Sequence, residues 1–118
     1  MLAAMNTGHE GSLSTCHANS PLDALRRVET MVVAGDAGLP LAAVHERAHA
    51  ALDLIVQVAR GSGGARQIVE IAEVGEPDDP MRVRSLAGPR CLLAQPSRPP
   101  RRPDAVPFVA PPGWECAR

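Results

Sequence analysis

The distribution of proline divides this chain into two parts that cannot fold in the same way. Two of the twelve prolines lie in residues 1–74, and the other ten lie in residues 75–118. Proline donates no backbone hydrogen bond and breaks the interior of helices and central strands. Residues 1–74 are therefore predicted to form the folded domain. Residues 75–118, which also carry seven of the twelve arginines, are predicted to be a Pro/Arg-rich and mostly disordered tail.

Composition excludes several classes of function. The formal net charge is −1, so no general electrostatic attraction to nucleic acid is expected. One Trp and one Phe are the only aromatic residues, which argues against base stacking. No stretch is long and apolar enough for insertion into a membrane. The three cysteines are widely spaced and odd in number, and reduced thiols are the simpler interpretation.

The first part contains clear signals for helices and strands. "MLAAMNTG" is typical of the end of a helix, and residues 11–18 ("GSLSTCHA") predict a strand that ends at His17. A helix follows, with Ser20 as its N-cap, Pro21 in its first turn and Gly35 at its end. A second helix begins at Pro40; its predicted apolar stripe is formed by Leu41, Val44, Ala48 and Leu52.

Residues 53–74 predict a β-hairpin. "DLIVQVAR" and "ARQIVEIAEV" are rich in β-branched residues, the second alternates apolar and acidic residues, and "GSGG" between them is a turn sequence. The predicted order is strand, two helices and hairpin. The strand at 11–18 has no evident partner in this order, so further sequence upstream is expected.

"HERAH", residues 45–49, matches the H-E-x-x-H pattern of zinc peptidases. Residues i and i+4 share a helix face, so His45 and His49 are candidate metal ligands and Glu46 a candidate general base. A third ligand is required, and the spacing singles out neither Glu70 nor Glu73. The alternative is an amphipathic helix with two histidines beside its apolar stripe.

A longer segment, "TGHEGSLSTCHANSPLDALRRVETMV", resembles the histidine-box segment of the type II/IV secretion and pilus-assembly ATPases, especially the CpaF-like, Flp/Tad pilus branch. The resemblance runs from Met1 through "LPLAAVHERAHAALDLIVQVAR" to Val74. It implies an α/β fold, namely part of a RecA-like P-loop ATPase core. It also implies that the helix with "HERAH" packs against this core and binds no metal, so we predict no stoichiometric zinc.

The resemblance implies roles for particular residues. His17 and Thr15 would be catalytic, at the carboxyl end of their strand, where ligands of open α/β sheets bind. Ser14 would lie near the nucleotide. Arg60, Arg26 and Arg27 are candidates for a subunit interface, because the intact family forms hexameric rings with ATP and Mg²⁺. Those rings are cytoplasmic and peripheral to the inner membrane, where they act on secretion or pilus platform proteins. The alternative for the three arginines is that they are solvated surface charges. The alternative for Ser14, Thr15 and His17 is that they are ordinary strand residues whose polar groups are hydrogen-bonded.

The chain has no lysine and therefore no G-x-x-x-x-G-K-[ST] phosphate loop. "GSGGAR", residues 61–66, is no substitute, because it lies between two strands and opens no helix. The acidic Walker B segment is expected just before Met1. We therefore predict a carboxyl-terminal fragment of such an ATPase, inactive alone and without a bound cofactor. Its origin as a truncated gene, a split gene, a pseudogene or a misassigned start stays open. Two alternatives remain: a small zinc metallopeptidase, and a non-catalytic remnant that binds a partner.

Overall fold

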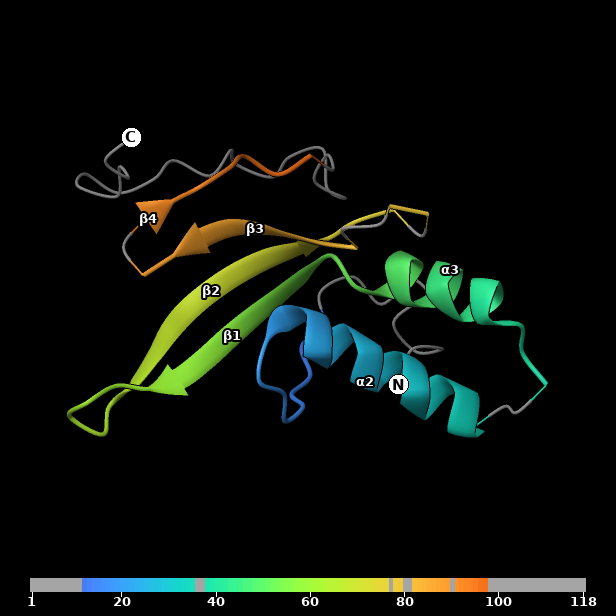
Figure 1. The fold of residues 1–118 in the computed structure, drawn as a ribbon, viewed down its shortest axis with the longest axis horizontal. Helices are drawn as coiled ribbons and strands as arrows, with labels where there is room; N and C mark the ends of the chain where they lie inside the picture. Colours follow the sequence, from blue (N-terminus) through green and yellow to red (C-terminus); the bar gives the residue numbers. More distant parts are fainter. Residues whose placement is uncertain (1–11, 36–37, 77, 80–81, 90, 98–118) are drawn as a thin grey trace.

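The computed structural model describes residues 12–35, 38–76, 78–79, 82–89 and 91–97. Two helices, α2 (Pro21–Gly35) and α3 (Leu41–Ala51), precede four strands (Figure 1). The strands are β1 (Leu54–Arg60), β2 (Arg66–Val74), β3 (Val83–Gly88) and β4 (Cys91–Leu92). Within the described residues, neither helix is long and apolar enough to cross a membrane.

Helix α2 begins where the sequence predicts it. The backbone N–H of Asp23 donates to Ser20 Oγ at 3.1 Å, and the N–H of Asn19 donates to Asp23 Oδ2 at 2.9 Å. These two bonds satisfy backbone donors at the start of the helix, where no preceding turn supplies a carbonyl. Leu25 and Val28, three residues apart on one face of α2, are buried, so this apolar face of the helix packs into the core.

Helix α3 buries only the middle of its predicted apolar stripe. Val44 and Ala48 are completely buried, and Leu52 packs against the core just after the helix ends. Leu41, in the first turn, is 61% exposed, so its predicted place in the core is wrong. A residue one turn before Val44 lies beyond the small apolar cluster that the other elements provide.

The strands form one antiparallel sheet in the order β1-β2-β3-β4. β1 and β2 form the predicted hairpin, with Arg60 opposite Arg66 at its turn and a bulge after Gln57. β2 then pairs with β3, and β3 with the short β4. Among the described strands, β1 therefore pairs along one edge only.

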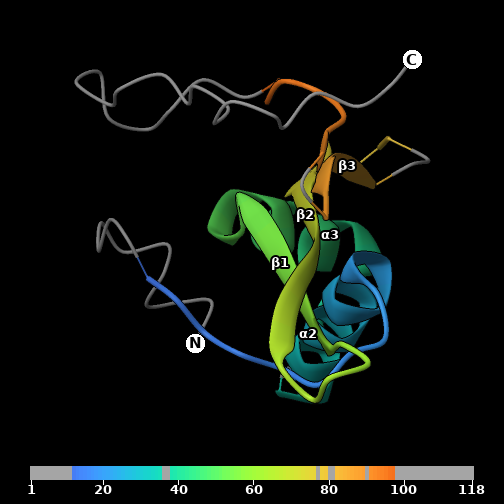
Figure 2. The ribbon, with the colours of Figure 1, turned by 90° about the vertical axis from the view of Figure 1, so that its left-hand side faces the viewer.

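The core lies between the helices and one face of this sheet. Leu25, Ala48 and Val74 form its buried centre, and Leu52, Ile55 and Val83 pack around them. Helix α2 lies across one face of the sheet, and α3 lies beside the end at which β1 begins (Figures 1 and 2). The fold of the described residues is thus α/β, with two helices against an antiparallel four-stranded sheet.

Residues 12–18 were expected to be part of a strand, and this prediction is wrong for the structure of the chain. They have no regular secondary structure, and the side chains from Ser12 to His17 are exposed. An isolated extended segment leaves its backbone groups without the ladder of bonds that stabilises a strand. The predicted helix end in residues 1–8 lies outside the described residues.

The predicted tail also contains ordered structure. β3 and β4 both lie after residue 74. β3 forms there because Val83–Gly88 pairs with the edge of β2. Of the predicted tail, residues 77, 80–81, 90 and 98–118 lie outside the described residues. Cys16 is free, whereas Cys91 is disulfide-bonded, so the prediction of reduced thiols is wrong for Cys91.

Candidate functional site

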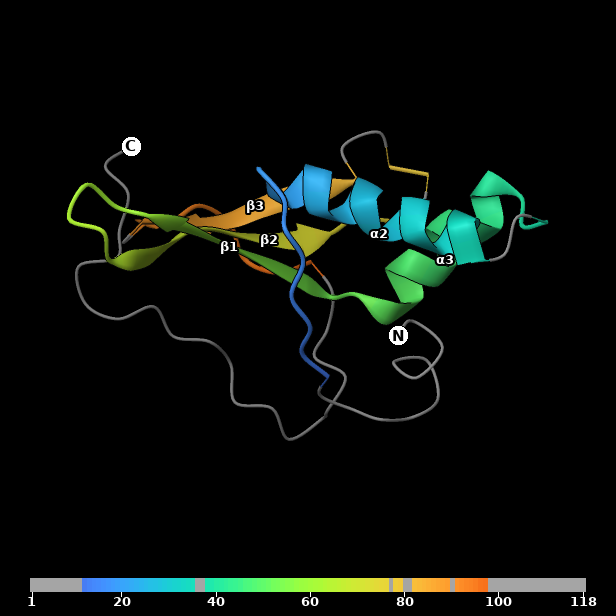
Figure 3. The same cartoon turned by 90° about the horizontal axis from the view of Figure 1, so that it is seen from below.

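The predicted catalytic segment lies on the surface, immediately before α2. Ser14, Thr15 and His17 are all exposed. The segment runs past the outer edge of β1 (Figure 3). It is tied there by the side chain of Gln57, whose Nε2 donates to the carbonyl oxygen of Ala18 at 3.0 Å. Together with the cap of α2, this bond fixes where the segment passes β1 before the chain enters the helix.

The three predicted interface arginines are exposed as well. Arg26 and Arg27 lie on α2, and Arg60 is the last residue of β1. Among the ion pairs that the described residues form, none includes these three side chains. The structure leaves them accessible to another molecule, or to water.

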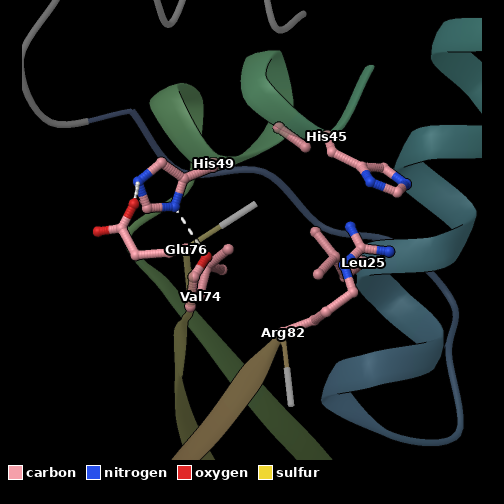
Figure 4. Close-up of a pocket in the computed structure, with 8 residues that line it drawn as sticks. Leu25, His45, His49, Val74, Glu76 and Arg82 are labelled. Carbon is pink, nitrogen blue, oxygen red and sulfur yellow. Dashed lines mark hydrogen bonds and ion pairs between the residues drawn. The ribbon is translucent and has the colours of Figure 1, made fainter. Parts of the chain in front are cut away.

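The histidines of "HERAH" lie in a polar cluster where α2, α3 and the β2–β3 connection meet (Figure 4). His49 Nδ1 is 2.8 Å from the carbonyl oxygen of Gly75, and His49 Nε2 is 3.1 Å from Glu76 Oε2. A carbonyl oxygen only accepts, so Nδ1 is the donor of the first bond. Both ring nitrogens of His49 therefore connect α3 to the residues just after β2. The pocket in Figure 4 is lined by Leu25, His45, Ala48, His49, Val74, Gly75, Glu76 and Arg82.

His45 faces a different carboxylate. Its Nε2 lies 3.9 Å from Glu29 Oε1 on α2. Glu46 is exposed and lines a second hollow with Ala42, His45 and Asp78. Among the described residues, no group of three or more His, Cys, Asp and Glu side chains is arranged to hold a metal ion. His45 and His49 thus share a helix face as predicted, but each is directed to a different acidic partner.

The centre of this cluster is an ion pair that the sequence analysis missed. Glu29 on α2 is only 6% exposed, and both of its oxygens accept hydrogen bonds from the guanidinium of Arg82. One of these bonds, from Nη1 to Oε2, measures 3.2 Å. The pairing of two oxygens with two guanidinium nitrogens is the strongest geometry for such a pair. The available signal was an acidic residue directly after Val28, on the apolar face of the predicted helix.

A second buried carboxylate lies on the opposite side of β2. Glu73 is 3% exposed and accepts from Arg84 Nη2 at 2.7 Å, from Ser97 Oγ at 2.8 Å and from the Ser97 backbone N–H. Arg84 also donates to the carbonyl oxygen of Gln95 at 2.9 Å. Glu70 accepts from Ser85 Oγ. Glu70 and Glu73, considered above as distant metal ligands, therefore bond to β3 and to the segment after β4.

The part of this chain that matches known proteins includes the segment before α2, both helices and the β1–β2 hairpin. The model of the type II/IV secretion system protein family matches residues 1–83. A putative conjugal transfer protein of Mycobacterium tuberculosis is 44% identical over 72 residues, which is 61% of this chain and 20% of that protein. Conjugal transfer protein TrbB of Rhizobium radiobacter is 38% identical over 74 residues, 63% of this chain and 21% of that protein. The chain thus spans about one fifth of the length of these relatives.

The family match includes the exposed segment with Ser14, Thr15 and His17, both helices and the β1–β2 hairpin. It extends over well more than half of the 118 residues. This chain belongs to the type II/IV secretion system protein family.

Proposed function

We propose that this chain is the part of a secretion ATPase that positions the reacting phosphate of ATP. The proposal rests on one observation, the family match across the exposed segment that precedes α2. The resemblance favours pilus assembly of the Flp/Tad type as the process, and the names of the relatives favour conjugal transfer. Both processes move macromolecules, and in both the chain would supply the same site.

One edge of β1 pairs with no other described strand, so residues 11–18 could join the sheet there. A strand formed by residues 11–18 would extend the sheet if further strands of the same protein paired with it. Its last residues would then lie at the carboxyl end of a strand, where ligands of open α/β sheets bind. The bond from Gln57 already holds Ala18 beside β1. The same bond would keep His17 close to that sheet.

At such a position, His17 and Thr15 would act through hydrogen bonds. Phosphoryl transfer depends mainly on orienting the attacking water and stabilising the charge on the γ-phosphate. An imidazole or a hydroxyl within about 3 Å of those oxygens supplies such a contact. Ser14 would contribute more weakly. ATP and Mg²⁺ would be held largely by the phosphate loop and the acidic segment of the complete ATPase, at the inner membrane.

The exposed arginines provide candidates for assembly into the hexamer of the intact family. Arg60 ends an apolar strand, while Arg26 and Arg27 follow one another on α2. None is needed for the core of the described chain, since all three are exposed. Removal of Arg60 in a complete ring would therefore lower assembly or turnover without lowering the stability of the subunit.

The test of the catalytic role uses a chimera, in which residues 1–74 replace the matching segment of a longer family member that hydrolyses ATP. His17→Ala should lower the ATPase rate by roughly 10²-fold or more, because one positioned hydrogen bond in the transition state is worth about 2.7–4 kcal/mol. The affinity for nucleotide should change little.

His45→Ala and His49→Ala in the same chimera serve as controls, since these side chains bond within the protein. Their rates should stay close to that of the parent chimera. If both helix histidines were essential and His17 were dispensable, the assignment of the catalytic segment would be overturned.

A further inference from the structure

The peptide bond between Ala18 and Asn19 is held on both sides by side chains of other elements. Its carbonyl oxygen accepts a hydrogen bond of 3.0 Å from Gln57 Nε2 on β1. Its N–H donates to Asp23 Oδ2, in the first turn of α2, at 2.9 Å. A peptide unit is planar, so two bonds on opposite sides fix the orientation of the whole plane. The sheet and the helix together therefore orient the chain directly after His17.

Gln57 interrupts an apolar stretch of β1. The strand reads "LIVQVAR", and Ile55, two residues before Gln57, packs against the core. Side chains two residues apart point to the same side of a strand, so Gln57 lies on the side that carries the helices. It is half-buried there, where a polar side chain normally has a hydrogen-bond partner. The partner of its amide nitrogen is a carbonyl 39 positions earlier in the sequence.

The surroundings of Gln57 favour a hydrogen-bond donor at this position. Glu70 is its register partner on β2 and therefore lies on the same side of the sheet. Ser85 Oγ on β3 donates to the Glu70 carboxylate. A carboxylate at position 57 would be repelled by Glu70, whereas a positively charged donor would be attracted to it. Position 57 thus accepts donors of either the amide or the ammonium type.

We propose that Gln57 is the positioning residue of the catalytic segment, and that its bond to Ala18 sets the direction in which His17 faces the nucleotide. This inference rests on the proposed function. An imidazole assists phosphoryl transfer only when its ring nitrogen is placed correctly at the reacting oxygens. His17 directly precedes Ala18, so a rotation of the Ala18–Asn19 peptide would move the imidazole away from that place.

Asp23 is less suitable than Gln57 for testing this role, because it also belongs to the cap of α2. Its backbone N–H donates to Ser20 Oγ, and a negative charge in the first turn stabilises a helix. Replacing Asp23 would therefore change the stability of α2 as well as the orientation of the peptide. The side chain of Gln57 takes no part in the backbone ladder between β1 and β2. Its substitution separates orientation from folding.

Nuclear magnetic resonance relaxation of the 118-residue chain tests the bond itself. Gln57→Met keeps the length of the side chain and removes the donor. The order parameter of the Ala18 N–H should fall from about 0.85 to below about 0.6, the values of rigid and flexible backbone. Gln57→Val, which has the shape of its strand neighbours, should have the same effect. Gln57→Lys, which restores a donor, should return the order parameter to the parent value.

Gln67→Met is the matched control. Gln67 is exposed on β2 and is the register partner of Ala59, so it lies on the same side of the hairpin as Gln57. The substitution is chemically identical and lies away from the Ala18 carbonyl. It should leave the order parameter of Ala18 unchanged.

The chimera described above tests the consequence for catalysis. Gln57→Met should lower kcat about tenfold and change KM for ATP by less than about twofold, because orientation matters most in the transition state. Gln57→Lys should recover kcat to within about threefold of the parent. In the His17→Ala background, Gln57→Met should cause no further loss, since both substitutions remove the same contact. A loss of stability alone would instead multiply with the effect of His17→Ala.

An unchanged order parameter of Ala18 in both Gln57→Met and Gln57→Val would overturn the inference. So would a loss of kcat that Gln57→Lys does not relieve, or one that multiplies with the effect of His17→Ala. These results leave the catalytic role of His17 intact. A parent rate in His17→Ala would instead overturn the proposed function, and with it the catalytic part of this inference, while the relaxation of Ala18 would still measure the bond to Gln57.

Discussion

At the scale of single residues, Glu29 decides how α2 and the sheet are joined. The residue lies on the buried side of α2, where an unpaired carboxylate would carry a large desolvation cost. Arg82 compensates this charge from the start of β3, and His45 approaches the same carboxylate from α3. One side chain thus connects three elements. Its partners explain why an acidic residue is tolerated in an apolar helix face.

Glu29→Gln should destabilise the protein by about 1–3 kcal/mol, because Arg82 would keep its charge and lose its counter-ion. This loss is at the lower end of what breaking a buried ion pair costs, because 21% of the Arg82 side chain is exposed to solvent. Urea unfolding measures the change. Glu46→Gln, at an exposed position on α3, is the control and should change the free energy of unfolding by less than about 0.5 kcal/mol. Equal effects of the two substitutions would contradict a structural role for the Glu29–Arg82 pair.

The histidines of "HERAH" make a second prediction at this scale. His49 bonds to a carbonyl oxygen and a carboxylate, and His45 is directed toward Glu29. We expect less than 0.1 zinc per chain (an order-of-magnitude limit), because two ligands with these partners do not form a tetrahedral site. Elemental analysis of protein purified without chelator measures the metal content. One zinc per chain, lost in His45→Ala, would restore the metallopeptidase interpretation.

At the scale of elements, the β1–β2 turn shows why "GSGGAR" is no phosphate loop. Two of its backbone N–H groups are hydrogen-bonded within the turn: Gly61 N–H donates to the carbonyl of Ala65, and Gly64 N–H donates to the carbonyl of Gly61. Both bonds measure 2.9 Å. The turn leads into a strand, which confirms the predicted hairpin. Its glycines serve the backbone geometry of the turn.

Gly64→Ala should destabilise the hairpin by about 1 kcal/mol, because Gly64 has a φ of 78°, which disfavours a Cβ. Gly63→Ala is the control: no heavy atom lies within 4 Å of its ideal Cβ, and its φ is not in the left-handed region. Its effect should be close to zero. Thermal unfolding of the two variants compares them directly, and an equal or larger loss for Gly63→Ala would contradict the assignment of the cost to the positive φ of Gly64.

At the scale of the whole molecule, the described chain combines a small core with a large accessible sheet face. The fully buried large side chains are Leu25, Val44 and Val74. Two ion-pair clusters, around Glu29 and Glu73, flank β2 and join the segments that follow it to the rest of the protein. The sites of proposed function lie outside this core, on the segment before α2 and on the hairpin.

The 118-residue chain alone should hydrolyse no ATP. It contains no lysine, so no side chain of the phosphate-loop type can contact the β- and γ-phosphates. Phosphate release with MgATP measures the activity, and the His17→Ala variant gives the background. Turnover that depends on magnesium and disappears in His17→Ala would contradict this expectation and indicate a different phosphate site.

The sequence by itself determined the elements whose signals are local. Ser20, Pro21 and Gly35 set the limits of α2, and the alternation in residues 66–74 with its glycine turn set the hairpin. The peculiar segment around His17 identified the family. These features depend on backbone preferences within a few residues, which a single sequence displays.

Only the tertiary structure decided the contacts between distant residues. Glu29 and Arg82 are 53 positions apart, and nothing local to either indicates that they pair. β3 forms in the proline-rich part because β2 offers it an edge, while residues 12–18 stay irregular without a neighbouring strand. Strand pairing and burial depend on which surfaces meet in space, so local patterns cannot specify them.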